Sequence, residues 1–535
     1  MKQLFSNINS LSSAQTDSRI AFSWFHRGLG LIYLFAIFPL FFQITSLIGS
    51  NGLMPAEELI ALSKKDQGLL QTFLQFPSLF HFFQYNVTLY VLVGLGCVGG
   101  LMLVLSFRVF FGALLAWISF LSITSIGGDF FVIIIDLFLS EVGFLALFST
   151  YYLEKHGYTP KLVDWVFRLL NFRLWFSMGV IKFYLPQDVW SNFTFFDYFF
   201  QAQPMPSPAA PIFQALPDFF KHAALIGLFL GEIIVPFFVF GGKRLRRIAF
   251  FTFVLISSLI QLTGNYGYFN VLSIILALLI LKDGDLKLIR VSKVTNSTNI
   301  KASLSTTVKI LLCYHILLQT IYCILLFQPN PHSPQNHFNY FFITRTSENK
   351  FLSSIAKPFE LTENWRMCNP YGVFRGIPYY HSEIRLSGSE DSIHWQTYEF
   401  KYVPSGKTDY LGFYAPYYPR LDHLFFYETI AAPNYKWNPL NRYYNENNNW
   451  VCRFINKLLD NDPKTTQLMK HNPFEEKQAP NYIKAEVFRL SFTKDDNRCW
   501  AVKPMGISKI YSKTNICKKP IISFEEAMKT IYSHD

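Results

Sequence analysis

Long apolar segments, one after another, are the feature that most constrains this chain. A helix of about 18 or more apolar residues can cross a bilayer. Runs of this kind lie near residues 22–48, 87–106, 109–126, 130–151, 165–183, 222–240, 248–263, 266–281 and 309–327. The residues are 51% hydrophobic, 18% aromatic and only 16% charged, which excludes an ordinary soluble globular protein. The sequence therefore predicts a multi-pass membrane protein with about nine helices.

The charges of the loops predict the orientation of these helices. Basic residues resist translocation, and the loop 241–247 (GGKRLRR) has four of them and no acid. The loop 184–220 has Asp188, Asp197 and Asp218 but no Lys or Arg. We therefore expect a cytoplasmic N-terminus and an extracytoplasmic C-terminus, in the endoplasmic reticulum membrane of a eukaryote or the inner membrane of a bacterium. The first apolar run is too long for a signal-peptide core and is expected to remain as an anchor.

The C-terminal region has a different pattern. The segments SEIRLSGS, WQTYEFKY and AEVFRLSFT alternate with period two, which is typical of strands, whereas WVCRFINKLL has helical spacing. The predicted fold class is an α-helical multi-pass membrane bundle followed by a β-rich, sandwich-like extracytoplasmic domain. The predicted boundaries are a cytoplasmic segment at 1–20, a transmembrane domain at 21–327 and the β-rich domain at 328–535.

Four cysteines lie in the predicted extracytoplasmic region: Cys368, Cys452, Cys499 and Cys517. They could form two disulfides by any of three pairings, or remain as buried thiols. A Cys-x-x-Cys motif is absent from the sequence, so a thiol-exchange site of that type is not expected.

The segment 201–208 (QAQPMPSP) has three prolines within five residues, between two apolar regions. Neither a helix nor a sheet can run through such a segment, and the loop charges place it outside the membrane. One interpretation is a connector that stays out of the bilayer. The other is a rigid lip over a cavity or a partner site, in which Gln203, Pro204, Met205 and Pro206 would face a client.

Ionisable residues within the apolar runs need a partner or a polar cavity. With a rise of about 1.5 Å per residue, Arg27 and Glu141 lie at similar depth from the cytoplasmic side and could form an ion pair. Glu232 lies near the middle of its helix and could meet Arg173. The first interpretation is that such pairs hold the bundle together.

Asp136 and Lys182 lie at similar depth near the outer side of the membrane. The alternative interpretation is therefore functional: a polar cavity open to the outside in which one of these two residues handles protons.

Common catalytic and cofactor motifs are absent from the sequence. It has no Gly-x-Ser-x-Gly, no P-loop, no Gly-x-Gly-x-x-Gly and no His-Glu-x-x-His, and its histidines lack metal-ligand spacing. We therefore predict no cofactor and no metal. The formal net charge is +12, but the basic residues are spread over membrane loops, so the expected partners are membrane lipid and protein, not nucleic acid.

Motifs along nearly the whole chain resemble the lipase maturation factor family: FHRGLG, SEVGFL, FRLWFSMGVIKF, DYFFQAQPMPSP, GEIIVPFFVFGGKRLRRIA, TGNYGYFN, NPYGVFRG, IRLSGSEDSIHWQTYEFKY, YYPRLDHLFF and PNYIKAEVFRLSFT. The resemblance implies a multi-pass protein that assists the maturation of secreted lipases in the endoplasmic reticulum. It also implies that the C-terminal domain contacts the client and that QAQPMPSP is a family signature.

A second, more remote resemblance concerns the membrane half. Gly179-Val180-Ile181-Lys182 stands where the superfamily of vitamin K-dependent gamma-carboxylase has its catalytic lysine. Two classes of function are therefore expected. The first is a folding factor without enzymatic activity. The second is a membrane enzyme with a lipid- or quinone-sized cavity, in which Lys182 is the base and Asp136 or Glu232 tunes it.

Overall fold

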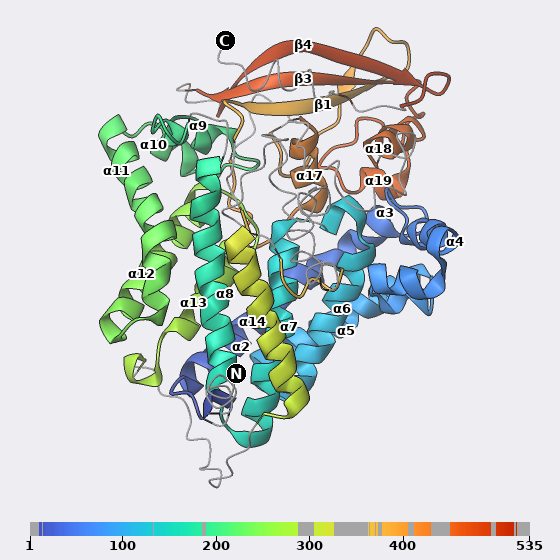
Figure 1. Cartoon of the computed structure of the whole chain (residues 1–535). Helices are drawn as coiled ribbons and strands as arrows, with labels where there is room; N and C mark the ends of the chain where they lie inside the picture. Colours follow the sequence, from blue (N-terminus) through green and yellow to red (C-terminus); the bar gives the residue numbers. More distant parts are fainter. Residues whose placement is uncertain are drawn as a thin grey trace, which may run out of the picture.

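The structure is a computed structural model. It describes residues 10–12, 14–131, 133–184, 189–286, 304–325, 362, 364–369, 371–372, 377–404, 411–429, 450–493, 499–517 and 521. A bundle of long helices forms one part of the molecule, and a sheet lies across one end of that bundle, with short helices in between (Figure 1).

Seven helical segments in the described part of the chain are long and apolar enough to cross a membrane. They are α2 with η1 (Arg19–Ile37 and Phe38–Phe42), α5 (Asn86–Val104), α6 (Val109–Ile126), α7 (Ile134–His156), α11 with η5 and η6 (Asp218–Phe229, Leu230–Ile234 and Val235–Phe240), α12 (Lys243–Thr263) and α14 (Thr306–Leu325).

Two further helices lie in predicted spans. The first, α8 (Lys161–Val180), is long but carries charged residues, and the second, α13 (Phe269–Ala277), is extended by η7 (Leu278–Ile280) to only 12 residues. A helix thus lies in each of the nine predicted ranges, while the number of membrane crossings and their orientation stay predictions.

Glycines allow the helices α2, α5 and α6 to approach closely. A Cβ added to Gly99 would lie 2.6 Å from the carbonyl oxygen of Gly112, and one added to Gly30 would lie 2.6 Å from that of Gly100. Small residues are common at such contacts in membrane bundles. In apolar lipid the hydrophobic effect does not drive helices together, so their association depends on close van der Waals packing.

The remaining short elements of the N-terminal part lie in the connections. They are α3 (Ile44–Ile48), α4 (Ala56–Gln75), η2 (Leu79–His81), η3 (Gly128–Phe131), η4 (Ile181–Tyr184), α9 (Phe195–Ala202), α10 (Ala210–Gln214) and η8 (Asp283–Asp285).

A four-stranded antiparallel sheet forms the C-terminal region, in the order β2-β1-β3-β4. Its strands are β1 (His381–Ser389), β2 (Gln396–Thr397), β3 (Tyr482–Phe492) and β4 (Trp500–Ser512), and its helices are α17 (Arg420–Thr429), α18 (Trp450–Leu459) and α19 (Pro463–Thr466). In the register, Ile384 of β1 stands opposite Val487 of β3. The helix α17 contacts β1, and α18 contacts β3.

The predicted fold class, a helical membrane bundle followed by a β-rich region, is confirmed. The layer that opposes the sheet consists of α17 and α18, and among the described residues no second sheet is present. The hydrophobic core runs from one region into the other. The rings of Phe130 and Trp450, one from each region, lie 5.3 Å apart, and Trp450 also contacts Phe425.

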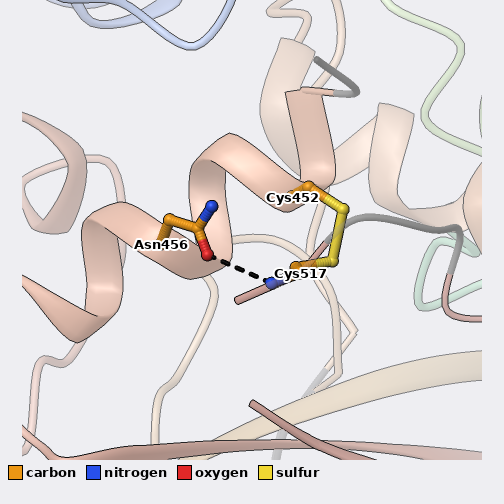
Figure 2. The surroundings of a disulfide bond; sticks show 3 residues. All are labelled: Cys452, Asn456 and Cys517. Atoms are coloured by element: carbon orange, nitrogen blue, oxygen red, sulfur yellow. Dashed lines mark hydrogen bonds between the residues drawn. A yellow bond between two sulfur atoms is a disulfide. The ribbon is translucent and has the colours of Figure 1, made fainter. Parts of the chain in front are cut away.

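Of the four candidate cysteines, Cys452 and Cys517 form a disulfide (Figure 2). It joins α18 to the segment that follows β4, and the side-chain oxygen of Asn456 accepts a hydrogen bond of 3.3 Å from the backbone nitrogen of Cys517. Cys368 and Cys499 carry free thiols, so only one of the two possible disulfides is formed.

Candidate functional site

The buried charges of the membrane helices meet the C-terminal region at one end of the bundle. Asp136, in the first turn of α7, is fully buried and is held by both ends of the Arg420 guanidinium, at 2.8 and 2.9 Å. The hydroxyl of Tyr268 donates a further hydrogen bond of 2.7 Å to Asp136. Arg420 also donates to the carbonyl oxygen of Phe130 and lies over the ring of Phe131. Asp136 is therefore bound by a residue of the C-terminal region, and the expectation that it would share a site with Lys182 is wrong.

Glu141, about one turn further along α7, lies in a second buried cluster. Its carboxylate pairs with Arg173 of α8, and both side chains are fully buried. It also accepts hydrogen bonds from the backbone nitrogen of Asn369 (2.9 Å) and the hydroxyl of Tyr371 (2.7 Å). The nearest imidazole nitrogen of His315, in α14, is 3.5 Å away. The helices α7, α8 and α14 and the C-terminal region thus meet at one carboxylate.

The predicted pair of Arg27 and Glu141 is wrong. Arg27 is partly exposed, donates a hydrogen bond of 2.8 Å to Ser106 and lies over the ring of Trp24. Its neighbour His26 faces the protein interior instead, where it contacts Ser149 at 2.8 Å. Two features separate Arg27 from Glu141. His26, next to Arg27, contacts Ser149, eight residues further along α7 than Glu141, and Arg27 itself is partly exposed.

Lys182 and Glu232 form the third buried pair. The expected pair of Glu232 with Arg173 is therefore wrong, and of the two acids expected beside Lys182 it is Glu232, not Asp136, that contacts it. Lys182 is 2% exposed, donates to Glu232 and to the carbonyl oxygen of Met178 (2.9 Å), and lies 5.2 Å from the centre of the Trp190 ring. Gly179 makes the pairing possible, because a Cβ there would lie 3.0 Å from the backbone carbon of Glu232. Among the described residues, Lys182 is held as the counter-ion of Glu232.

The QAQPMPSP segment fills a gap between the two regions. Gln203 donates hydrogen bonds to the carbonyl oxygens of Thr263 (2.7 Å) and Phe200 (3.0 Å) and accepts one from the hydroxyl of Tyr266 (2.7 Å). The backbone oxygen of Gln203 accepts a hydrogen bond from His381 of β1. Burial lowers the pKa of His381 to about 4, so this imidazole is neutral and donates through Nδ1.

The prolines of this segment keep it extended, and it runs beside the turn that follows α12. Pro206 forms a β-bridge with Gly264, and the backbone nitrogen of Asn265 donates to the carbonyl oxygen of Met205. Gln203, Met205 and Pro206 are buried, and Pro204 is partly exposed. The segment is therefore packed between the two regions and not raised as an open lip, while Met205 and Pro206 also line the cavity described below.

Asn265 fixes the C-terminal region from the same turn. Its amide nitrogen donates to the carbonyl oxygen of Gly412 (2.8 Å), and its side-chain oxygen accepts from the backbone nitrogens of Tyr414 (2.7 Å) and Ala415 (3.2 Å). A cavity of about 330 Å³ lies next to this contact. Its walls are Met205 and Pro206 on one side and, on the other, Phe400, Lys401, Tyr402, Val403, Pro404, Leu411, Tyr414 and Lys470.

Several residues of this junction were missed by sequence reasoning, including Arg420, Tyr371 and Asn265. Arg366 is another: it donates to the carbonyl oxygens of Phe131 (2.9 Å) and Thr124 (2.6 Å). The first three lie within the motifs YYPRLDHLFF, NPYGVFRG and TGNYGYFN. These motifs were the one signal in the sequence that pointed to the three residues. Arg420 lies outside the predicted membrane spans, so the charges within the spans give no indication of it.

The chemistry of the junction is that of paired charges. Asp136, Glu141 and Glu232 each have an arginine or lysine as counter-ion, which compensates the cost of removing the charges from water. Among the described residues, no group of three or more His, Cys, Asp and Glu side chains could hold a metal ion.

Comparisons with known proteins agree with this division into two regions. A family model described as the lipase maturation factor transmembrane domain matches residues 20–288, and one described as the lipase maturation factor C-terminal domain matches residues 367–503. Similar proteins include lipase maturation factor 2 of Rattus norvegicus, which is 26% identical over an alignment of 590 residues, gaps included. The alignment covers 90% of this chain and 82% of the relative. Lipase maturation factor 1 of Homo sapiens is 24% identical over 512 residues, covering 88% and 83% respectively. No solved structure matches the chain. Because the two models together cover most of its length, the chain belongs to the lipase maturation factor family.

Proposed function

We propose that this chain is a membrane-anchored maturation factor that assists the folding of exported proteins, with secreted lipases as the client class. Membership of the family and the names of the relatives support this role. The proposal includes an extracytoplasmic C-terminal region, in the endoplasmic reticulum or at the outer side of a bacterial inner membrane.

The observation that carries the proposal is the way in which the C-terminal region is attached. Arg420 binds Asp136, and Tyr371 and Asn369 bind Glu141, all in buried positions. Buried, charge-assisted hydrogen bonds of this kind fix the relative position of two parts of a protein. The membrane bundle thus holds the C-terminal region next to the bilayer, where an exported client emerges.

We place the contact with the client at the cavity beside Met205 and Pro206. Its lining combines aromatic and aliphatic side chains with Lys401 and Lys470, which suits an extended segment that presents apolar and acidic side chains. A photo-crosslinking amino acid at Tyr414, in the cavity wall, should capture a co-expressed client. The matched control is the same amino acid at Ile393, which is 74% exposed in the turn between β1 and β2. Equal capture at both positions would contradict this placement.

The contacts of Lys182 favour this role over that of a membrane enzyme. A catalytic base must reach its substrate and release its proton, whereas Lys182 is buried and held by Glu232 and a backbone carbonyl.

The role itself can be tested in cells that lack their own maturation factor and express a secreted lipase. Expression of this chain should raise the specific activity of the secreted lipase, while a secreted reporter of another class should be unaffected. If lipase activity and secretion are unchanged although the chain is present in the membrane, the lipase client is refuted.

A further inference from the structure

The segment 56–85, which we name the α4 segment, exposes more large apolar side chains than a soluble surface would. It comprises α4 (Ala56–Gln75), η2 (Leu79–His81) and the residues leading to α5. Leu69, Leu70 and Leu74 are exposed, as are Phe82, Phe83 and Tyr85, with exposed fractions of 70% for Leu70 and 67% for Phe83. So many exposed apolar side chains within 17 residues, from Leu69 to Tyr85, indicate an interaction surface.

The α4 segment has a defined conformation that presents these side chains. Gly68 has a φ of 82°, in the left-handed region, and breaks α4 into two short helices. The hydroxyls of Ser63 and Thr72, one from each helix, are 3.1 Å apart and close the bend. Leu69 and Leu70 begin the second helix, directly after the bend. The contact between Ser63 and Thr72 stabilises the bend and, with it, the exposed position of these two leucines.

The position of the α4 segment indicates what covers it. Tyr85 directly precedes α5, and the outward residues of α5 include Val87, Val91 and Leu95, which are exposed at the spacing of a helix face. The apolar surface of the α4 segment therefore continues into the lipid-facing surface of a membrane helix. In Figure 1, α4 lies at the side of the molecule, beyond the ends of α5 and α6 that are nearest the sheet region.

The polar side chains of the segment fit the same place. Lys64, Lys65 and Asp66 are exposed just before the bend, as expected for residues among lipid headgroups. Glu58, near the start of α4, forms an ion pair of 2.6 Å with Arg453 of α18. The segment thus contacts the C-terminal region at one end and joins a membrane helix at the other.

We propose that Leu69, Leu70, Leu74, Phe82 and Phe83 are embedded in the bilayer leaflet on the side of the C-terminal region. The α4 segment is then an anchor on the membrane surface, and its partner is the lipid bilayer. It supports α18 through Glu58 and sets the height of the C-terminal region above the membrane. This inference rests on the chain crossing a membrane and is independent of the client.

The proposal can be tested with the full-length protein in nanodiscs whose phospholipids carry a diazirine in the acyl chain. After photolysis, lipid adducts are located by peptide mass spectrometry. Peptides containing Leu70 and Phe83 should be labelled as strongly as those of the outward face of α5, and at least about tenfold more than the peptide containing Ile393, because the probe lies within the hydrocarbon. Ile393 is the control because it is equally exposed but lies in the turn between β1 and β2.

A variant separates embedding from chance contact. With Leu70→Glu and Phe83→Glu combined, labelling of the α4 segment should fall several-fold, because carboxylates are costly in hydrocarbon, while labelling of α5 should stay unchanged and report an intact bundle. The matched variant Ile393→Glu should alter neither. If the parent segment is labelled no more than the Ile393 peptide, the proposal is refuted. Crosslinking of the same residues to a co-expressed client instead of lipid would also overturn it.

Discussion

Replacement of Arg420 by methionine should destabilise the junction between the membrane bundle and the C-terminal region. Arg420 is buried, makes two charge-assisted hydrogen bonds to Asp136 and donates a third to the carbonyl oxygen of Phe130. Breaking one partner of a buried ion pair costs about 3–5 kcal/mol, because the other charge is left uncompensated. At about 1.4 kcal/mol per factor of ten, this is a shift of roughly a thousandfold in the folding equilibrium.

The assay is thermal unfolding of the purified protein in nanodiscs, together with limited proteolysis of the C-terminal region. Arg420→Met should lower the unfolding temperature and make the C-terminal region sensitive to protease. Arg453→Met is the matched control, because its pair with Glu58 is partly exposed and should contribute less than about 1 kcal/mol.

The double variant Asp136→Leu with Arg420→Met distinguishes a charge effect from a packing effect. Since it removes both charges, it should recover about 0.5–3 kcal/mol relative to the sum of the single variants. The recovery will be incomplete, because Tyr268 loses the acceptor of its hydrogen bond. The reasoning is refuted if Arg420→Met unfolds within about 1 kcal/mol of the parent, a loss typical of exposed pairs, or if the single effects simply add.

Three further predictions follow from other contacts. Lys182→Met should reduce the amount of folded protein in the membrane, since it leaves Glu232 buried without a counter-ion, and Lys182→Met with Glu232→Leu should restore it. A stable Lys182→Met protein that has lost only activity would make Lys182 catalytic. Replacement of Cys452 and Cys517 by serine should cost about 2–4 kcal/mol, because their disulfide closes a long loop, with a sequence separation of 65; thermal unfolding with and without reductant measures this, and an unchanged midpoint would contradict it. Burial raises the pKa of Asp422 to about 6, so between pH 4 and pH 6 the folded protein binds a proton that the unfolded chain has released. The free energy of unfolding therefore falls as the pH rises from 4 through 6. Asp422→Asn should therefore gain about 2–3 kcal/mol relative to the parent between pH 4 and pH 7, and equal pH profiles of the two proteins would refute the shift.

Local pattern was enough to predict most of the elements. Apolar length located the membrane helices, and period-two alternation located β1 and β3. Helical spacing predicted α18, which begins at Trp450 and ends at Leu459. In each case the burial of a face or of a whole segment leaves a periodic trace in the sequence.

Elements without such a trace were missed. The strand β4 is an edge strand that contains Pro504 and Gly506, and Gly506 has a φ of 77°. Proline and glycine interrupt strand patterns and are tolerated at edges, where fewer ladder hydrogen bonds are needed. The helix α17 is buried on nearly every side, so its sequence shows no separation of polar and apolar faces.

The partners of the membrane charges could not be predicted, because the estimate used only depth. Depth gives one coordinate, whereas an ion pair also requires that both side chains point toward each other. Arg27 lies on a partly exposed face of α2, and its neighbour His26 contacts Ser149, well away from Glu141 on α7, whereas Arg173 reaches Glu141 from α8.

A second reason concerns where the partners lie in the chain. Asp136 is neutralised by Arg420, which is 284 residues away in the sequence, and Glu141 binds Asn369 and Tyr371. Without the C-terminal region, the carboxylate of Asp136 would have only Tyr268 among these partners and would carry a buried, uncompensated charge. The two regions therefore stabilise each other, although the sequence divides them by composition. Several of the motifs that carry the family resemblance meet at this junction. A substitution on one side of the junction removes the partner of a buried group on the other side, and this mutual dependence accounts for the place of the motifs.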